Sequence, residues 1–150
     1  MPFQQIDILD WRLAVDPEAT RQAHKRLEVG CDCAYCRNFL AQQARLPAQL
    51  HHTLHLLGID PTKPAEIVEY TQNPDGSHWY SWWYHAVGHI IVNRHSDGDN
   101  DQNAKVTPDI AVSIAAKADL APADFPQPVL QIEFFSNLPW VLDEQPDNEV

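Results

Sequence analysis

The chain has 150 residues, 44% hydrophobic and 21% charged, with a formal net charge of −11 at pH 7. The length suits one domain over residues 1–150, with enough core to fold without a metal ion or a disulfide. Residues 61–150 hold 14 acidic residues and 4 Lys/Arg, a net of −10. That charge argues against nucleic-acid and anionic-membrane binding, and it serves either solubility or the docking of a basic protein partner on the acidic C-terminal part.

The ends and the apolar stretches of the sequence favour a cytoplasmic protein. The N-terminus has no basic segment followed by an apolar run, so no signal peptide is expected. The apolar stretch "AVGHIIV", residues 86–92, is too short to span a bilayer. The three cysteines are an odd number, which rules out a fully paired disulfide framework within the chain.

The first half of the chain is predicted to hold one strand and about three helices. Residues 4–15 read as a strand whose alternation slips once, which indicates a bulge. Asp16, Pro17 and Glu18 are a helix start, and Gly30 is the predicted end of that helix. Two further helices are expected, one after Cys36 and a second from Pro47 to Gly58.

The second half is predicted to hold four strands in hairpin order. The turn "NPDG" joins the first two strands, and the second of them bends at Gly88. These four strands are expected at 67–72, 77–94, 108–118 and 129–138. Residues 95–105 are expected to form a mobile loop, which is unlike a calcium loop, and residues 145–150 a frayed tail. The predicted fold is therefore α+β, an antiparallel sheet of about five strands with two to three N-terminal helices on one face.

All three cysteines fall within six positions, at Cys31, Cys33 and Cys36. Zinc takes four tetrahedral ligands and accepts thiolate sulfur, so a CxCxxC segment can supply three of them. The fourth ligand must come from elsewhere, and His85 on the aromatic strand is the first candidate. His89 on the same strand and the pair His51 and His55 are weaker candidates, which fit ordinary core or surface residues better.

The cysteine segment is also compatible with two roles that involve no metal ion. Cys33 and Cys36 could be a redox pair, with Cys33 the attacking thiol at a helix N-terminus. Neither the surrounding elements nor the third cysteine fits a thioredoxin-like unit. The thiols could also be small buried residues that only pack a tight turn.

The segment "HWYSWWYH", residues 78–85, concentrates aromatic side chains on one strand. Alternation places Trp79 and Trp83 on one face and Tyr80, Trp82 and Tyr84 on the other. Core packing accounts for this pattern, and a stacking platform for a sugar or another flat ligand is the alternative. Phosphate-loop, nucleophile-elbow and zinc-protease motifs are absent from the sequence, so no sequence motif supports a hydrolase or nucleotide-binding function.

Three blocks together resemble a family of small, uncharacterised bacterial single-domain proteins: "CDCAYCRNF", "LGIDPTKPAE" with "WYHAVG", and "LPWVLDE". The resemblance covers most of the chain from residue 29 onward. The resemblance implies a self-contained cytoplasmic domain and adds no enzymatic activity. It also implies that some members carry Cys at the position of His85, a replacement that would keep a metal ligand there. The sequence thus predicts a non-enzymatic domain with a zinc site at Cys31, Cys33, Cys36 and His85 and an acidic interaction face. A thiol-redox protein and an aromatic-lined ligand-binding module are the alternatives.

Overall fold

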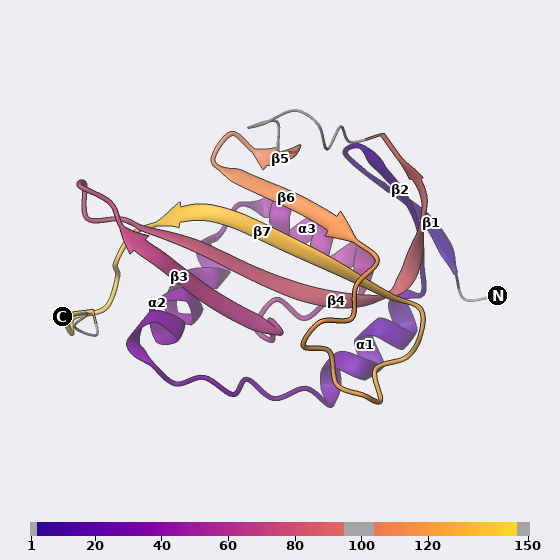
Figure 1. Ribbon diagram of the computed structural model, residues 1–150, viewed down its shortest axis with the longest axis horizontal. Coiled ribbons are helices and arrows are strands. Elements are labelled where there is room, and N and C mark those ends of the chain that lie inside the picture. Colours follow the sequence, from indigo (N-terminus) through magenta and orange to yellow (C-terminus); the bar gives the residue numbers. More distant parts are fainter. Residues whose placement is uncertain (1–2, 95–103, 147–150) are drawn as a thin grey trace.

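The computed structural model describes residues 3–94 and 104–146 (Figure 1). Its elements are, in chain order, β1 (Gln4–Ile8), β2 (Trp11–Val15), α1 (Pro17–Lys25), α2 (Ala34–Gln42), the short 3-10 helix η1 (Gln43–Arg45), α3 (Ala48–Leu57), β3 (Glu66–Gln72), β4 (His78–Asn93), β5 (Ala104–Thr107), β6 (Ile110–Ala115) and β7 (Val129–Leu138). None of the helices in these ranges is long and apolar enough to cross a membrane.

One antiparallel sheet organises the molecule, so the predicted α+β class is confirmed. The strand order is β1-β2-β4-β7-β6-β5, with β3 also paired to β4. The prediction of about five strands was wrong, because the sheet has seven. The helices are not all N-terminal either: they follow the β1–β2 hairpin, and α2 and α3 lie behind the sheet in Figure 1.

The two missed strands lie in residues 4–15 and at residues 104–107. Residues 4–15 are a hairpin and not one bulged strand, because the chain reverses at Leu9, whose φ is 52°. A left-handed leucine is unfavourable, so residue type alone does not indicate a turn there. Ala104 and Lys105, expected in a mobile loop, belong to β5 and pair with β6. The remainder of that predicted loop, and most of the predicted tail, lie outside the described residues.

Strand β4 is the central strand of the sheet, and two different strands pair with it along one edge. Its first part pairs with β3 and its last part with β2, while β7 runs along the opposite edge. A gap between the two partners is closed by α1. The Val87 amide donates to Thr20 Oγ1 at 2.9 Å, and His24 Nε2 donates to the His85 carbonyl at 2.9 Å. Helix side chains thus replace a strand at this point, which satisfies backbone groups that burial would otherwise penalise.

The helices begin and end partly as predicted. Asp16 caps α1, accepting from the Ala19 amide at 3.0 Å, but the helix ends at Lys25, well before Gly30. Helix α3 follows Pro47 and stops at Gly58 in the left-handed conformation with φ of 81°, as predicted. Helix α2 begins earlier than expected, at Ala34, so that Cys36 lies inside the helix.

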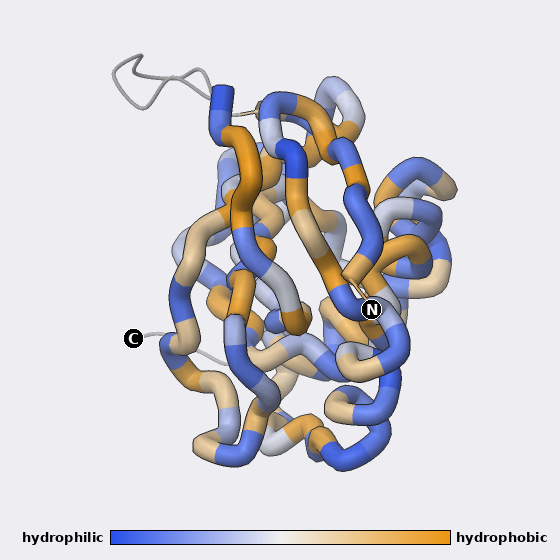
Figure 2. The backbone as a smooth tube through the Cα atoms, turned by 90° about the vertical axis from the view of Figure 1, so that its right-hand side faces the viewer, coloured by the Kyte–Doolittle hydropathy of each residue, from blue (hydrophilic) through white to orange (hydrophobic). Residues whose placement is uncertain are grey.

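The main core lies between α2, α3 and the even-numbered face of β4. Tyr80, Trp82 and Tyr84 are fully buried there, and Phe39 of α2 packs on Trp82 with ring centroids 5.0 Å apart. Successive side chains of a strand point to opposite faces, and the colours along the backbone in Figure 2 show hydrophobic and hydrophilic residues following one another in the strands. A second, smaller cluster forms on the other face of β4, where Val87 packs with residues of α1 and of the β6–β7 loop.

Candidate metal centre

The three cysteines converge at the N-terminus of α2. Cys33 is the N-cap residue, in an extended conformation, and Cys36 lies in the first turn, where residues three apart share one side of a helix. The extended backbone before the helix brings Cys31 back beside them. Cys31 is exposed, Cys33 is partly exposed and Cys36 is buried, so the group opens to solvent on one side.

The sulfur atoms are close enough to share one ion. Cys31 Sγ lies 3.2 Å from Cys33 Sγ, and all three Sγ atoms lie within 4.8 Å of one another. Around one zinc ion with bonds of about 2.3 Å, tetrahedral sulfurs lie about 3.8 Å apart. The thiols would therefore need to move by only about 1 Å to ligate a common zinc ion.

The two outer thiols differ in their electrostatic surroundings. Hydrogen bonds, from the Cys36 thiol first and from the Cys33 backbone next, lower the pKa of Cys31. Burial, followed by the neighbouring thiols, raises the pKa of Cys36 above its ordinary range. The N-terminal end of α2 carries partial positive charge, which favours thiolate at this position. The Cys31 thiol, on the solvent side, is therefore easier to deprotonate than the buried Cys36 thiol.

Arg37 ties the cysteine segment to the C-terminal part of the chain. Its Nη1 donates to the Asp32 carbonyl at 2.5 Å, and its Nη2 contacts Glu144 Oε1 at 2.7 Å. Both contacts are at the surface, where an isolated ion pair contributes little stability. These contacts instead keep the backbone between Cys31 and Cys33 next to the segment after β7.

Two buried side-chain amides of α2 also bind the backbone of this C-terminal segment. Asn38 Oδ1 accepts from the Val141 amide at 2.8 Å, and Asn38 Nδ2 donates to the Pro139 carbonyl at 3.1 Å. Gln42 Nε2 donates to the same carbonyl at 2.9 Å. The cysteine-containing helix and the "LPWVLDE" segment are therefore one structural unit, although they lie about a hundred positions apart in the sequence.

The structure does not bring His85 to the thiols. The metal-ligand group found among the described residues consists of Cys31, Cys33 and Cys36 alone. His85 is buried on the odd-numbered face of β4, where its ring lies 6.0 Å from that of Phe125. Odd- and even-numbered side chains of β4 point to opposite faces of the sheet. Because α2 packs on the even-numbered face, His85 lies on the other face from the cysteines.

The remaining candidate histidines also lie outside the group. His51 Nε2 contacts the Gln43 carbonyl at 2.9 Å, and His89 is exposed, with its ring 5.8 Å from that of Phe3. His55 is exposed near the end of α3. Each is accounted for as a core-edge or surface residue.

One polar pair near α2 had no signal in the sequence. His78 Nδ1 and Glu69 Oε2 are 2.6 Å apart and almost fully buried. His78 Nε2 has no hydrogen-bond partner among the described residues, and Tyr35, which lies between Cys33 and Cys36, packs near its ring at 6.1 Å. Only the register of the β3–β4 hairpin brings His78 and Glu69 together, so their spacing in the sequence could not show it.

The aromatic strand is divided as alternation predicted. Its even-numbered aromatic residues are core, while Trp79 and Trp83 are partly exposed on the opposite face. Trp79 stacks on Phe135 of β7, with centroids 6.2 Å apart and an interplanar angle of 18°. The Trp79–Phe135 pair is where a flat ligand would stack, and this alternative stays a prediction.

Comparison of the chain with protein-family models, with curated proteins and with solved structures found no match. The resemblance to small bacterial single-domain proteins therefore stays a prediction.

Proposed function

We propose that this protein binds one zinc ion through Cys31, Cys33 and Cys36, as a non-enzymatic protein with a partner at its acidic surface. The observation that carries the proposal is the convergence of three sulfur atoms within 4.8 Å at a helix N-terminus. Thiolate ligands select zinc and other soft ions over magnesium and calcium. Since bound zinc with three thiolates has a net charge of −1, the adjacent Arg37 and the helix dipole both favour the loaded state.

The fourth coordination position is proposed to face outward. The described residues place no fourth ligand in the group, and the exposed Cys31 marks its solvent side. Structural zinc sites close with four protein ligands, whereas an open position accepts water or an incoming ligand. We propose that a donor atom from a partner, or a water molecule, completes the site. The negative charge of residues 61–150 favours a basic partner.

Cobalt substitution tests the proposal directly. Protein expressed without an affinity tag is expected to bind one equivalent of Co²⁺, with thiolate-to-cobalt charge-transfer absorption whose intensity reports three sulfur ligands. Zinc should displace the cobalt and abolish the absorption. Cys33→Ser and Cys36→Ser should each lose about a third of the absorption and bind metal at least tenfold more weakly.

His85→Gln is the matched control, because His85 lies outside the group. That variant should bind cobalt as the parent protein does, with circular dichroism confirming its fold. Less than half an equivalent of metal in the parent, or unchanged binding in Cys33→Ser, would overturn the proposal. A large loss in His85→Gln would instead restore His85 as a ligand.

A second function is favoured by the 3.2 Å contact between Cys31 Sγ and Cys33 Sγ. Two thiols at this distance can form a disulfide, passing two electrons and two protons to a disulfide substrate that is reduced to two thiols. The sequence favoured Cys33 and Cys36 as the redox pair, with Cys33 attacking. We propose as the alternative function the pair Cys31 and Cys33, with Cys31 as the attacking thiol because it is the exposed one. Thiol counting by mass spectrometry after incubation with oxidised glutathione distinguishes the two, since bound zinc protects all three cysteines and a redox pair loses two thiols reversibly.

A further inference from the structure

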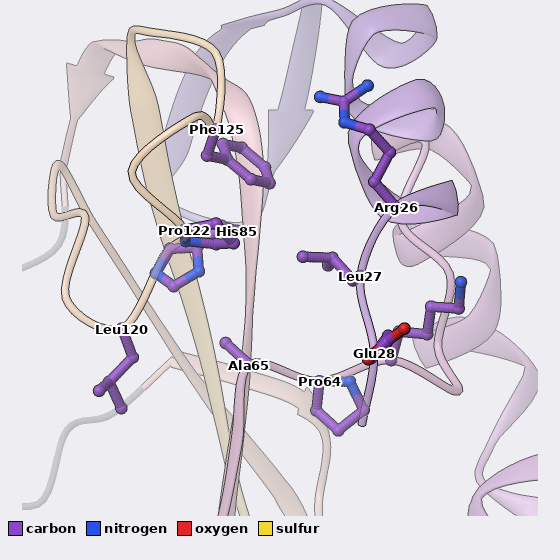
Figure 3. A pocket seen from close by; sticks show the side chains of 10 residues that line it. Arg26, Leu27, Glu28, Pro64, Ala65, His85, Leu120, Pro122 and Phe125 are labelled. Carbon is purple, nitrogen blue, oxygen red and sulfur yellow. The ribbon is translucent and has the colours of Figure 1, made fainter. Parts of the chain in front are cut away.

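A cavity of about 300 Å³ lies beside β4, on the face that carries His85 (Figure 3). Four segments form it: the end of α1 with the residues after it, the turn before β3, His85 of β4, and the β6–β7 loop. Its volume is at the lower end for small-molecule sites, which are concave, largely apolar and provided with a few polar groups. The zinc proposal does not involve any of its residues.

The apolar part of the wall is suited to a ring or a short hydrocarbon chain. Phe125, which is buried, lies above the cavity in Figure 3, with Pro64 and Ala65 below and Leu27 on the opposite side. Leu120 is 60% exposed and also lines the cavity. An exposed leucine gains contacts when an apolar ligand covers it.

His85 supplies a buried polar group on the same wall. The residue is only 2% exposed, and its Nε2 has no hydrogen-bond partner among the described residues. A buried polar atom without a hydrogen-bond partner destabilises the folded protein. A ligand that brings a polar atom to this ring would offset part of that destabilisation.

Two cations line the cavity without a carboxylate partner in the described chain. Lys63 Nζ donates to the carbonyl oxygens of His24 and Lys25 at 3.0 and 3.4 Å, and Arg26 Nη1 donates to the Gln22 carbonyl at 3.3 Å. Glu28 also lines the cavity, so the lining has a net charge of +1 with His85 neutral. A positive site is unusual in a chain with net charge −11, and it favours an anion.

We infer that this cavity binds a small organic carboxylate with an apolar body about the size of a phenyl ring. The carboxylate lies between Lys63 and Arg26, with His85 as a further hydrogen-bond partner. The apolar body lies against Phe125, Pro64 and Leu27.

Calorimetric titration with phenylacetate, 3-phenylpropionate and hexanoate tests the inference. At least one of these carboxylates should bind saturably with one-to-one stoichiometry. The uncharged phenylacetamide should bind at least tenfold more weakly than phenylacetate, because it cannot use the two cations. Absence of saturable binding by all three carboxylates, or equal binding of the acid and its amide, would overturn the inference.

Variants locate the site. Lys63→Gln and Arg26→Gln should each weaken phenylacetate binding at least fivefold, whereas Lys105→Gln removes the same charge from the distant strand β5 and should leave binding unchanged. Ala65→Phe should block the cavity and abolish binding. Should Ala65→Phe fail to fold, the exposed substitution Arg26→Gln still decides the matter. Parental affinity in both charge variants would contradict the inference, and Cys33→Ser should bind as the parent does because the metal centre is separate.

Discussion

Asn38 shows how one buried side chain holds two distant parts of the chain together. It is fully buried, and its amide bonds the Val141 amide and the Pro139 carbonyl. Asn38→Ala should destabilise the protein by about 2–4 kcal/mol, because it leaves buried backbone groups without partners. Urea unfolding measures the change, with the exposed Gln72→Ala as the control expected within about 0.5 kcal/mol of the parent. A loss below about 1 kcal/mol would mean that water replaces the amide.

Two buried histidines make the stability depend on pH. Burial lowers the pKa of both His24 and His85 from the ordinary 6.5. The smaller opposing effects are the hydrogen bond to the His85 backbone and then Asp60 at His24, and Gln131 and Asp119 at His85. Lys63 adds to the lowering at His24, and His24 itself adds to it at His85. The unfolded chain therefore takes up protons first as the pH falls below about 6.5, and the folded state loses stability there.

Urea unfolding between pH 7.5 and pH 5 should reveal this loss, with a slope of up to about 1.4 kcal/mol per pH unit for each histidine. His24→Gln keeps a donor for the His85 carbonyl but does not titrate, so its slope should be smaller than that of the parent. An equal slope in the variant would assign the acid sensitivity to other groups. At pH 7.5 both histidines are neutral in either state, and the variant then reports packing alone.

The candidate site was predictable at the level of single residues only in part. The spacing of Cys31, Cys33 and Cys36 indicated convergence because a chain turning into a helix brings such positions together. His85 was predicted as a fourth ligand from its place on an aromatic strand. Which face of that strand receives α2 depends on packing between elements far apart in the sequence, and periodicity alone does not contain that information.

At the scale of elements, Gly88 is needed where β2 crosses closest to β4. A Cβ at this position would lie 2.5 Å from the Ala14 carbonyl oxygen and 3.0 Å from Val15 Cα, both backbone atoms of β2. Gly88→Ala should therefore cost about 2–4 kcal/mol and loosen the β1–β2 hairpin.

Gly30→Ala is the matched control, because nothing lies within 4 Å of a Cβ there. It should change the free energy of unfolding by no more than about 0.5 kcal/mol. Equal effects of the two substitutions would show that the β2–β4 approach relaxes without cost. Proton NMR of the Leu13 and Val15 methyl groups would show whether the hairpin moves.

The elements with local end signals were predicted well. Pro47 and Gly58 bound α3, and the turn 73–76 joins β3 to β4, because fixed φ values act locally. The β1–β2 turn was missed because a leucine occupies the left-handed position that glycine or asparagine usually takes. The early end of α1 was missed because no local signal marks it. The last turn is bonded instead to the Lys63 side chain and to β4, which lie later in the chain.

At the scale of the whole molecule, the metal centre and the core are separate. The main core consists chiefly of residues of the sheet, α2 and α3. None of the cysteines belongs to this cluster, although Cys36 is itself buried. Removal of zinc with a chelator should therefore leave the far-ultraviolet circular dichroism at 25 °C unchanged and lower the melting temperature by a few degrees. A small zinc-dependent domain would unfold outright under the same treatment. Complete loss of secondary structure on chelation would contradict this separation.

Because side chains of α1 close the gap beside β4, two adjacent amides of β4 are expected to exchange their protons with deuterium by different routes. The Val87 amide is bonded to Thr20 of α1, whereas the next amide, Gly88, donates to the Pro128 carbonyl on the opposite edge at 2.9 Å. Exchange of the Val87 proton with deuterium thus requires only that α1 detach, while exchange at Gly88 requires β4 to part from the chain leading into β7. The exchange rates of these two neighbouring amides therefore report two different local opening events.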